Sequence, residues 1–155
     1  MKEVERKFLV KSEAYKREAT SALAIQQGFL STDPERTVRV RLQNGHGKIT
    51  IKGISDEEGV SRFEWEHAIP GDEAKQLLEL CKGALIAKTR YEVPSGKHVF
   101  EVDVFEGKNE GLVVAEVELE DPDESFEKPH WLGQEVTGDP KYYNAQLSIN
   151  TYKQW

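Results

Sequence analysis

A two-residue alternation of charged and apolar side chains recurs along this chain and constrains its fold more than any other feature. It is clearest in VRVRL (38–42), FEWEH (63–67) and AEVELE (115–120). Successive side chains of a β-strand point to opposite faces, so this period predicts strands with one charged and one apolar face. The predicted strands are Glu3 to Val10, Ala24 to Leu30, Thr37 to Gln43, Lys48 to Gly53, Val60 to Ile69, Leu85 to Val93, His98 to Phe105 and Leu112 to Glu120.

Turn residues separate these segments and predict hairpin connections, as in NGHG (44–47) and PSG (94–96). Apolar residues at helical spacing predict a helix from Asp72 to Lys82, and Asp139-Pro140 predicts the start of a short helix that ends near Leu147. No stretch has the composition of a linker. We therefore expect a single domain over residues 1–155, of mainly β (α+β) class, built as an antiparallel sheet or barrel.

The composition argues against several kinds of protein. A formal net charge of -7 is the wrong sign for a nucleic-acid surface, which needs an excess of lysine and arginine. Cys81 is the only cysteine, which rules out an intramolecular disulfide and a cysteine-based zinc site. No apolar run approaches the roughly 20 residues of a membrane span. We expect a cytoplasmic protein, monomeric or homodimeric, with no nucleic-acid or membrane partner.

Charged residues of the same sign repeat on one face of most predicted strands. A solvated sheet face is the simplest explanation for any single strand. Same-sign neighbours repel, however, so the whole set is better explained by absent partners: cations for the acids and an oxyanion for the bases. The sets are Glu3 and Glu5 with Lys7, Arg39 with Arg41, Lys48 with Lys52, Glu64 with Glu66, Lys88 with Arg90, Glu101 with Asp103, and Glu116 with Glu118.

The charge balance of these side chains indicates which ligand would suit them if the sheet closes with the charged face inward. One or two divalent cations supply about two to four positive charges and a triphosphate about four or five negative ones, so together they nearly cancel. Carboxylate ligands favour Mg²⁺ or Mn²⁺ over Zn²⁺. A neutral ligand or a fatty acid would instead call for an apolar interior.

The run EVERKFLV (3–10) resembles the E-x-E-x-K signature of the CYTH, or triphosphate tunnel metalloenzyme, superfamily. That resemblance implies an eight-stranded antiparallel β-barrel enclosing a tunnel, with a few covering helices. The chain is most similar to the short bacterial members, which are often inorganic triphosphatases. Further matching runs follow in the family's order: VRVRL (38–42), TIKG (50–53), FEWEH (63–67), AKTRY (87–91), FEVDVFEG (100–107), AEVELE (115–120) and GQEVTGDPKYYN (133–144).

The resemblance also implies roles for the charged residues. Triphosphate would be bound by the basic ones, with Lys88 also counted as catalytic: Lys7, Arg39, Arg41, Lys48, Lys52, Lys88 and Arg90. Mg²⁺ or Mn²⁺ would be held by four acidic ones: Glu3, Glu5, Glu116 and Glu118. The remaining acids are candidates for the general base, in no order that the sequence sets: Glu64, Glu66, Glu101 and Asp103.

The expected activity is metal-dependent hydrolysis of inorganic tripolyphosphate to pyrophosphate and phosphate. The alternatives are a class IV adenylyl cyclase, a thiamine or nucleoside triphosphatase, and a polyphosphate-binding module without turnover. The cyclases tend to carry a His-Phe element before E-x-E-x-K, and this chain shows neither that element nor an obvious insertion for a nucleoside pocket nor a CHAD extension. Phe29 stands where a tyrosine is common in similar bacterial chains.

Overall fold

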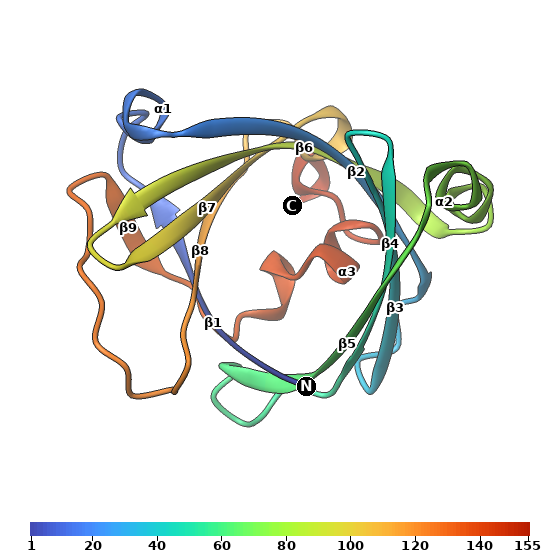
Figure 1. Cartoon of the computed structure of the whole chain (residues 1–155), viewed down its shortest axis with the longest axis horizontal. Helices are drawn as coiled ribbons and strands as arrows, with labels where there is room; N and C mark the ends of the chain where they lie inside the picture. Colours follow the sequence, from blue (N-terminus) through green and yellow to red (C-terminus); the bar gives the residue numbers. More distant parts are fainter.

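In a computed structural model, which describes residues 1–155, nine strands form one antiparallel sheet that closes on itself (Figure 1). The strand order is β5-β4-β3-β2-β6-β7-β8-β1-β9, and β1 also pairs with β5. Eight strands therefore make a closed barrel, as predicted, and β9 is an extra strand. Their bounds are β1 Lys2–Val10, β2 Ser21–Ser31, β3 Arg36–Gln43, β4 His46–Gly53, β5 Ser61–Pro70, β6 Lys82–Ser95, β7 His98–Phe105, β8 Val113–Glu118 and β9 Leu132–Glu135.

Strand β1 closes the barrel because it changes partners along its length. Its first residues, Lys2 to Val4, pair with β5, and Glu5 to Phe8 pair with β8. Beyond the end of β5, β9 pairs with the edge of β1 at Phe8 and Val10. Closure leaves no long unpaired edge in the ring, and it places the E-x-E-x-K segment at the seam between the two halves of the sheet.

The structure confirms both predicted hairpins but places the second loop at Gly96-Lys97, with Pro94 and Ser95 in β6, and it shortens the first predicted helix. Asn44 and Gly45 both have positive φ, 51° and 76°, as a two-residue hairpin loop requires. Helix α2 spans Gly71–Leu78 rather than Asp72 to Lys82, because the chain leaves the helix and Lys82 begins β6. Gly83 then takes a left-handed conformation, with φ 70°, which the apolar spacing of the sequence does not predict.

Three short elements differ from the predictions. Helix α1 (Tyr15–Glu18) and strand β9 (Leu132–Glu135) were not predicted, because four residues are too few to show a period. The predicted helix from Asp139 to Leu147 is split into a 3₁₀ turn at Pro140–Tyr142 and helix α3 at Asn144–Leu147, since Tyr143 between them is extended. Asp139 does cap the first turn by accepting from the Lys141 N–H. Two further 3₁₀ turns lie at Gly107–Asn109 and Tyr152–Gln154.

Apolar side chains of the strands pack against α1, α2 and β9. These elements lie outside the ring of barrel strands (Figure 1). Trp131, fully buried before β9, packs edge-on against Tyr15 of α1 and Phe100 of β7. On the other side Ala74 and Leu78 of α2 pack on β3. Each fully buried large side chain contributes roughly 1.5–3 kcal/mol. Because these two apolar clusters lie outside the ring, much of the interior is left for charged side chains.

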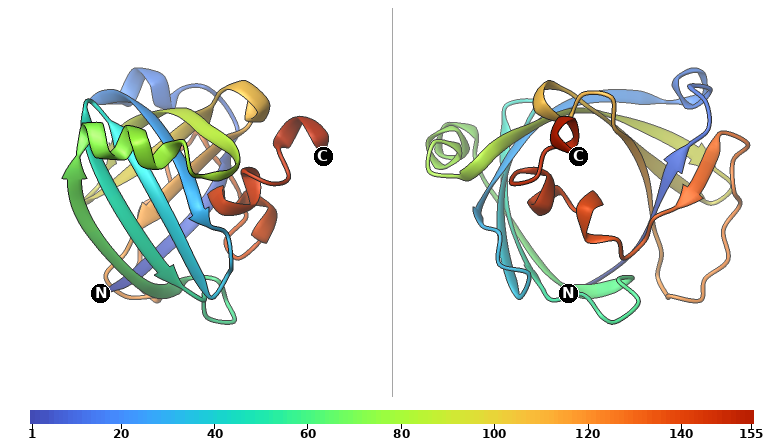
Figure 2. Two further views of the ribbon diagram at one scale, coloured as in Figure 1. Left: turned by 90° about the vertical axis from the view of Figure 1, so that its right-hand side faces the viewer. Right: turned by 180° about the vertical axis from the view of Figure 1, so that it is seen from behind.

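The C-terminal tail, residues 136–155, lies across one end of the barrel (Figure 2). There the inward side chains of the strands become apolar, and they form a cluster with the tail. Leu147 of α3 is fully buried in it. The tail therefore plugs part of that end. The cluster contains Phe29, Ile86, Phe105, Leu112, Val114, Val136, Tyr142 and Leu147.

None of the helices has the length and apolar character needed to cross a membrane.

Candidate active site

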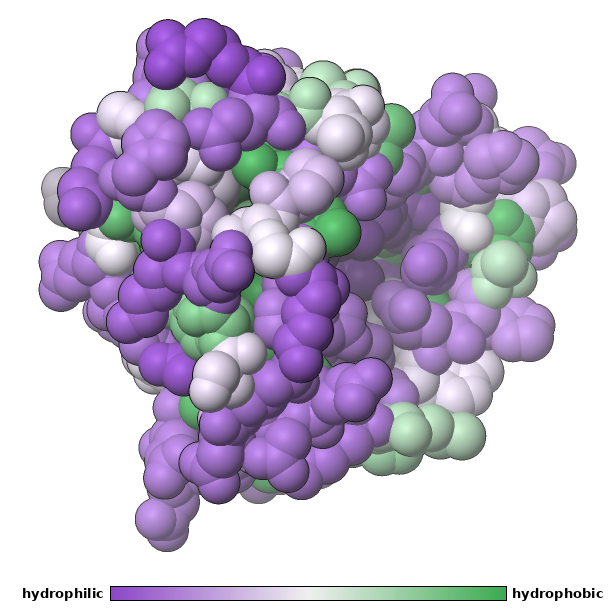
Figure 3. Space-filling view, turned by 60° about the vertical axis from the view of Figure 1, so that its left-hand side comes forward, coloured by the Kyte–Doolittle hydropathy of each residue, from purple (hydrophilic) through white to green (hydrophobic).

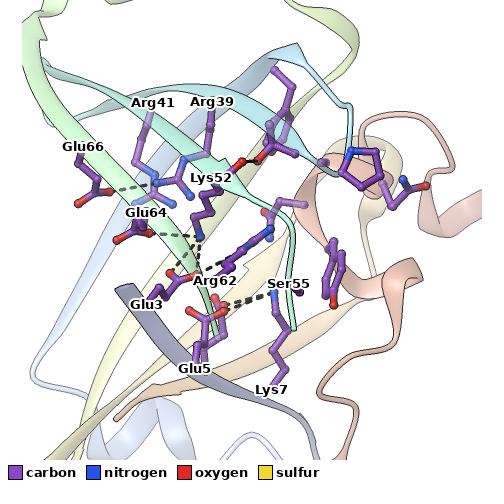
Figure 4. Close-up of a pocket in the computed structure, with 18 of the residues that line it drawn as sticks. Glu3, Glu5, Lys7, Arg39, Arg41, Lys52, Ser55, Arg62, Glu64 and Glu66 are labelled. Carbon is purple, nitrogen blue, oxygen red and sulfur yellow. Dashed lines mark hydrogen bonds and ion pairs between the residues drawn. The ribbon is translucent and has the colours of Figure 1, made fainter. Parts of the chain in front are cut away.

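The barrel encloses a cavity of about 340 Å³ with a largely charged wall, seen as a hydrophilic hollow in Figure 3 and from inside in Figure 4. Every residue predicted for the site lines it except Asp103, which is buried against Lys88 and Arg90. The whole chain has a formal charge of -7, yet the wall carries eight basic and seven acidic residues. Positive charge is thus concentrated inside. The basic residues are Lys7, Arg39, Arg41, Lys48, Lys52, Arg62, Lys88 and Arg90, and the acidic ones are Glu3, Glu5, Glu64, Glu66, Glu101, Glu116 and Glu118.

Two arginines on β3 form the part of the wall with the fewest acidic partners (Figure 4). Arg41 makes no ion pair, and its Nε donates only to the neutral Gln27 Oε1 at 2.9 Å. Arg39 donates to Thr50 and lies 3.5 Å from Glu66, but its Nε is buried without a hydrogen-bond partner. Burial and the neighbouring guanidinium groups lower the pKa of both, that of Arg41 to about 9. These donors are arranged for an anion that the protein itself does not supply.

Lys88, Asp103 and Arg90 form a buried cluster at the base of the cavity. Asp103 accepts from Arg90 Nε at 2.8 Å and Nη2 at 2.9 Å, and its Oδ2 is 2.7 Å from Lys88 Nζ. Burial alone would raise the pKa of Asp103, but the two cations hold it below its usual value. For Lys88, burial and nearby arginines outweigh Asp103 and lower the pKa to about 7. Lys88 therefore exchanges a proton near neutral pH.

Glu3 and Glu64 face each other across one lysine (Figure 4). Lys52 Nζ lies 3.0 Å from Glu3 Oε1 and 3.4 Å from Glu64 Oε2. Burial favours the neutral form of Glu3, but Lys52, the hydrogen bond with Glu64 and the charge of Arg62 together outweigh it and lower the pKa to about 2. Burial and the charge of Glu3 raise the pKa of Glu64 to about 7. Two acids thus compete for one cation.

A second acidic group lies where β1 meets β8. Glu5 stands opposite Glu118 and Lys7 opposite Glu116 in the strand register. Lys7 Nζ is 3.4 Å from Glu116 and 3.7 Å from Glu5. Burial and the neighbouring Glu116 raise the pKa of Glu5 well above its ordinary value. Like charges placed opposite each other destabilise a sheet. Lys7 alone does not balance the three glutamates, so a further positive charge would stabilise this group.

These acids fit a divalent metal in their chemistry, although the structure holds no preformed ligand cluster. No three carboxylate, histidine or thiol side chains converge on one point as metal ligands do. The carboxylates are instead held by Lys7 and Lys52. All the available donors are carboxylate oxygens, which suit hard cations such as Mg²⁺. Because burial and Glu116 disfavour the ionised form of Glu5 and raise its pKa, a bound cation would favour that form.

Arg62 lines the cavity but was missed in the sequence, although it lies two residues before Glu64 on the same face of β5. Its Nε is 3.5 Å from Glu3 Oε1. Extending the alternation of FEWEH by one step would have found it. Gln27 and Asn144, the uncharged partners of Arg41 and Lys88, carry no signal of this kind, since charge was what marked the inner face.

Glu101 and Glu118 also line a second cavity, of about 440 Å³, beside the β6–β7 hairpin. Three more glutamates surround it, with one lysine and His98. The shared residues show that the charged interior continues between the two cavities. The added glutamates are Glu92, Glu120 and Glu124.

Comparison with known proteins gives one consistent result. The CYTH domain family model matches residues 1–145. An inorganic triphosphatase from Acetivibrio thermocellus is 48% identical over 153 residues, covering 98% of this chain and 96% of that protein. An inorganic triphosphatase from Nitrosomonas europaea is 36% identical over 154 residues, covering 97% and 99%.

The fold agrees with this result. The crystal structure of the inorganic triphosphatase NE1496 superposes with a TM-score of 0.66 at 33% identity, covering 94% of this chain and 97% of that one. The charged inner face therefore belongs to a barrel already known from a similar protein. From the family match, the sequence relatives and the shared barrel, this chain belongs to the CYTH domain family.

Proposed function

We propose that this chain is an inorganic triphosphatase, which hydrolyses tripolyphosphate to pyrophosphate and phosphate inside the barrel. The observation that carries the proposal is the arginine pair on β3, where Arg41 has no acidic partner and Arg39 keeps an unpaired buried Nε. A protein with an excess of acids gains nothing from such a pair unless an anion binds there. The names of the two relatives support the same activity.

The size of the cavity supports a small anion. At about 340 Å³ it lies near the lower end of the roughly 300–1,000 Å³ typical of small-molecule sites. Arginine supplies a forked donor that can bind two oxygens of a phosphate group, and lysine supplies a compact positive charge; the wall carries both. A bare triphosphate uses such a wall fully, whereas a nucleoside would need apolar or stacking surface.

The reaction breaks the bond between the terminal phosphorus and the oxygen that bridges it to the rest of the chain, as water attacks that phosphorus. Charge builds on the leaving pyrophosphate, and the arginines and lysines of the wall neutralise it without having to reorganise. Lys88, with its pKa lowered to about 7, can hold or release a proton beside the reacting groups. Glu64, Glu66 and Glu101 also line the cavity and remain candidates for the base.

Asp103 has a different part in this proposal from that of the other candidate bases. Both of its carboxylate oxygens are engaged by Lys88 and Arg90, and it does not line the cavity. It therefore positions those two cations rather than reaching water.

Enzymes with CYTH triphosphate tunnels are metal-dependent, and we propose Mg²⁺ or Mn²⁺ for this chain. Glu3, Glu5, Glu116 and Glu118 would hold it, after Lys7 and Lys52 turn to the phosphates. When bound, a divalent cation supplies charge neutralisation and a more acidic water. A cytoplasmic location and a monomeric or homodimeric state remain predictions from the sequence.

The test is phosphate release from tripolyphosphate with Mg²⁺ or Mn²⁺ by the purified chain and by Glu5→Gln and Lys52→Ala. The matched control is Glu73→Gln, on the exposed side of α2. Wild type and control should release phosphate equally, and the two site variants should lose most of the activity. Undiminished release by both site variants would overturn the assignment, and tight binding of tripolyphosphate without release would make the protein a binding module.

A further inference from the structure

The tail places one polar side chain in the wall of the cavity. Asn144, the first residue of α3, accepts two hydrogen bonds at its Oδ1, from Gln27 Nε2 at 2.9 Å and from Lys88 Nζ at 3.0 Å. Gln27 is fully buried and Lys88 is 1% exposed. A single amide oxygen of the tail thus joins strands β2 and β6 from inside the barrel.

Gln27 extends this contact to the arginine pair. Its Oε1 accepts from Arg41 Nε at 2.9 Å while its Nε2 donates to Asn144. Because a guanidinium can only donate, Arg41 fixes which way the Gln27 amide points, and Gln27 in turn requires an oxygen from Asn144. The hydrogen bonds therefore run in one consistent direction from Arg41 to the tail.

The tail segment around Asn144 is held from several sides. The Tyr143 ring lies beneath Lys7 Nζ, 5.4 Å from its centroid, and beneath the Arg62 guanidinium at 5.6 Å. Leu147 anchors the other end of α3 in the apolar plug. An apolar residue at position 144 would plug the barrel equally well, and a buried amide is costly unless its hydrogen bonds are made.

We propose that Asn144 is a positioning residue of the active site: its side-chain oxygen orients the Lys88 amine directly and the Arg41 guanidinium through Gln27. The tail then completes the triphosphate site instead of only closing the barrel. This inference rests on the proposed function for its catalytic meaning, but the geometry on which it depends can be tested separately.

Asn144 is an uncharged side chain next to Lys88, whose other polar contact is with the charged Asp103. The charges that most influence Lys88 are those of Asp103 of β7, Arg90 of β6, Arg41 of β3 and Glu116 of β8, none of which belongs to the tail. Replacing the amide by a carboxylate of the same shape would put a negative charge about 3 Å from the lysine nitrogen, which favours its protonated form. The same substitution retains the acceptor for Gln27.

The experiment compares Asn144→Asp and Asn144→Ala with wild type and with Asn150→Asp, an exposed position on the same tail. In Asn144→Ala, kcat should fall about 10- to 100-fold, the usual cost of losing an outer partner of a reacting group, with a smaller change in KM. In Asn144→Asp, the limb of the pH–rate profile that reports Lys88 should shift to higher pH, by about one pH unit or more. Asn150→Asp should change neither. Wild-type kcat and pH profiles in both Asn144 variants, with only Tm lowered, would leave the tail as a plug and overturn the inference.

A second measurement tests the contact between Asn144 and Lys88 independently of the proposed function. Titration of the Lys88 side chain by NMR, with the Lys88→Met variant to assign its signal, measures the same shift without substrate. A raised titration midpoint in Asn144→Asp but not in Asn150→Asp supports the contact even if tripolyphosphate proves not to be the substrate. An unchanged midpoint contradicts it whatever the substrate is.

Discussion

The ammonium group of Lys88 lies 2.7 Å from the carboxylate of Asp103, and both side chains are 1% exposed. This contact does not fully offset the burial of the lysine, whose pKa falls to about 7 from an ordinary value of 10.5. Between these two pH values the unfolded chain binds a proton at this lysine that the folded chain does not. The free energy of unfolding therefore gains a contribution that rises with pH across that window.

Lys88→Met should accordingly stabilise the protein most at or below pH 7. We expect Tm to rise there by roughly 2–4 °C, corresponding to about 1 kcal/mol, and the gain to shrink toward pH 10. Thermal unfolding at pH 6 and pH 10 measures it, with the exposed Lys153→Met as control. A Tm difference that is the same at both pH values would contradict the burial argument.

Arg41→Gln should weaken the use of triphosphate without destabilising the fold. A hydrogen bond to a charged group contributes about 1.5–3 kcal/mol, so kcat/KM should fall about 10- to 100-fold. Tm should stay level or rise, because the variant removes a cation that has no acidic partner. Arg36→Gln, on the same strand but exposed and paired with Asp33, is the control for both measurements. Equal losses of kcat/KM in the two variants would count against a phosphate-binding role for Arg41.

Glu5→Gln should separate metal binding from folding. Without metal, the variant loses the repulsion between Glu5 and Glu116 and should unfold at a higher temperature than wild type. With Mn²⁺ added, wild type should gain Tm through ligand linkage and the variant should gain little. Titration of Tm against Mn²⁺ concentration measures both effects, again with Glu73→Gln alongside. An undiminished Mn²⁺ effect in Glu5→Gln would remove this residue from the metal site.

Gly138→Ala should loosen the tail. Gly138 has φ 81°, and a Cβ there would lie 2.8 Å from the Glu58 carbonyl oxygen. Gly45 has a similar φ of 76° but open space around it, so Gly45→Ala measures the backbone strain alone. We expect Gly138→Ala to lose about 1–3 kcal/mol of stability, more than Gly45→Ala, and to lower kcat because Asn144 moves with the tail. Matching losses of stability and unchanged activity in both variants would show that the close contact is unimportant.

The two-residue period predicted the strands and the inward set of charges because both follow from the pleat of a strand. It could not predict how far along the barrel axis each inward side chain lies. Asp103 has the same facing as Glu101, yet it packs between Lys88 and Arg90 and misses the cavity. The face to which a side chain points is set within its own strand, whereas its position along the barrel axis depends on the stagger of neighbouring strands.

The tail was the least predictable part of the site. Its helix is only four residues long, and the preceding Tyr143 is held extended against Lys7 and Arg62 of two strands. Such contacts are tertiary, so no local sequence pattern predicts them. Asn144 was noted only as part of the matching tail run, and neither it nor Gln27 was assigned to the site, because the role of each amide is visible only once the other is in place.

The central claim is tested most directly by comparing kcat/KM for tripolyphosphate, ATP and thiamine triphosphate at one matched concentration of Mg²⁺ or Mn²⁺. We predict that tripolyphosphate is preferred by at least about tenfold, a difference of roughly 1.4 kcal/mol in transition-state stabilisation, with one phosphate and one pyrophosphate released per turnover. Equal or better turnover of ATP or thiamine triphosphate, or formation of cyclic AMP from ATP, would contradict it.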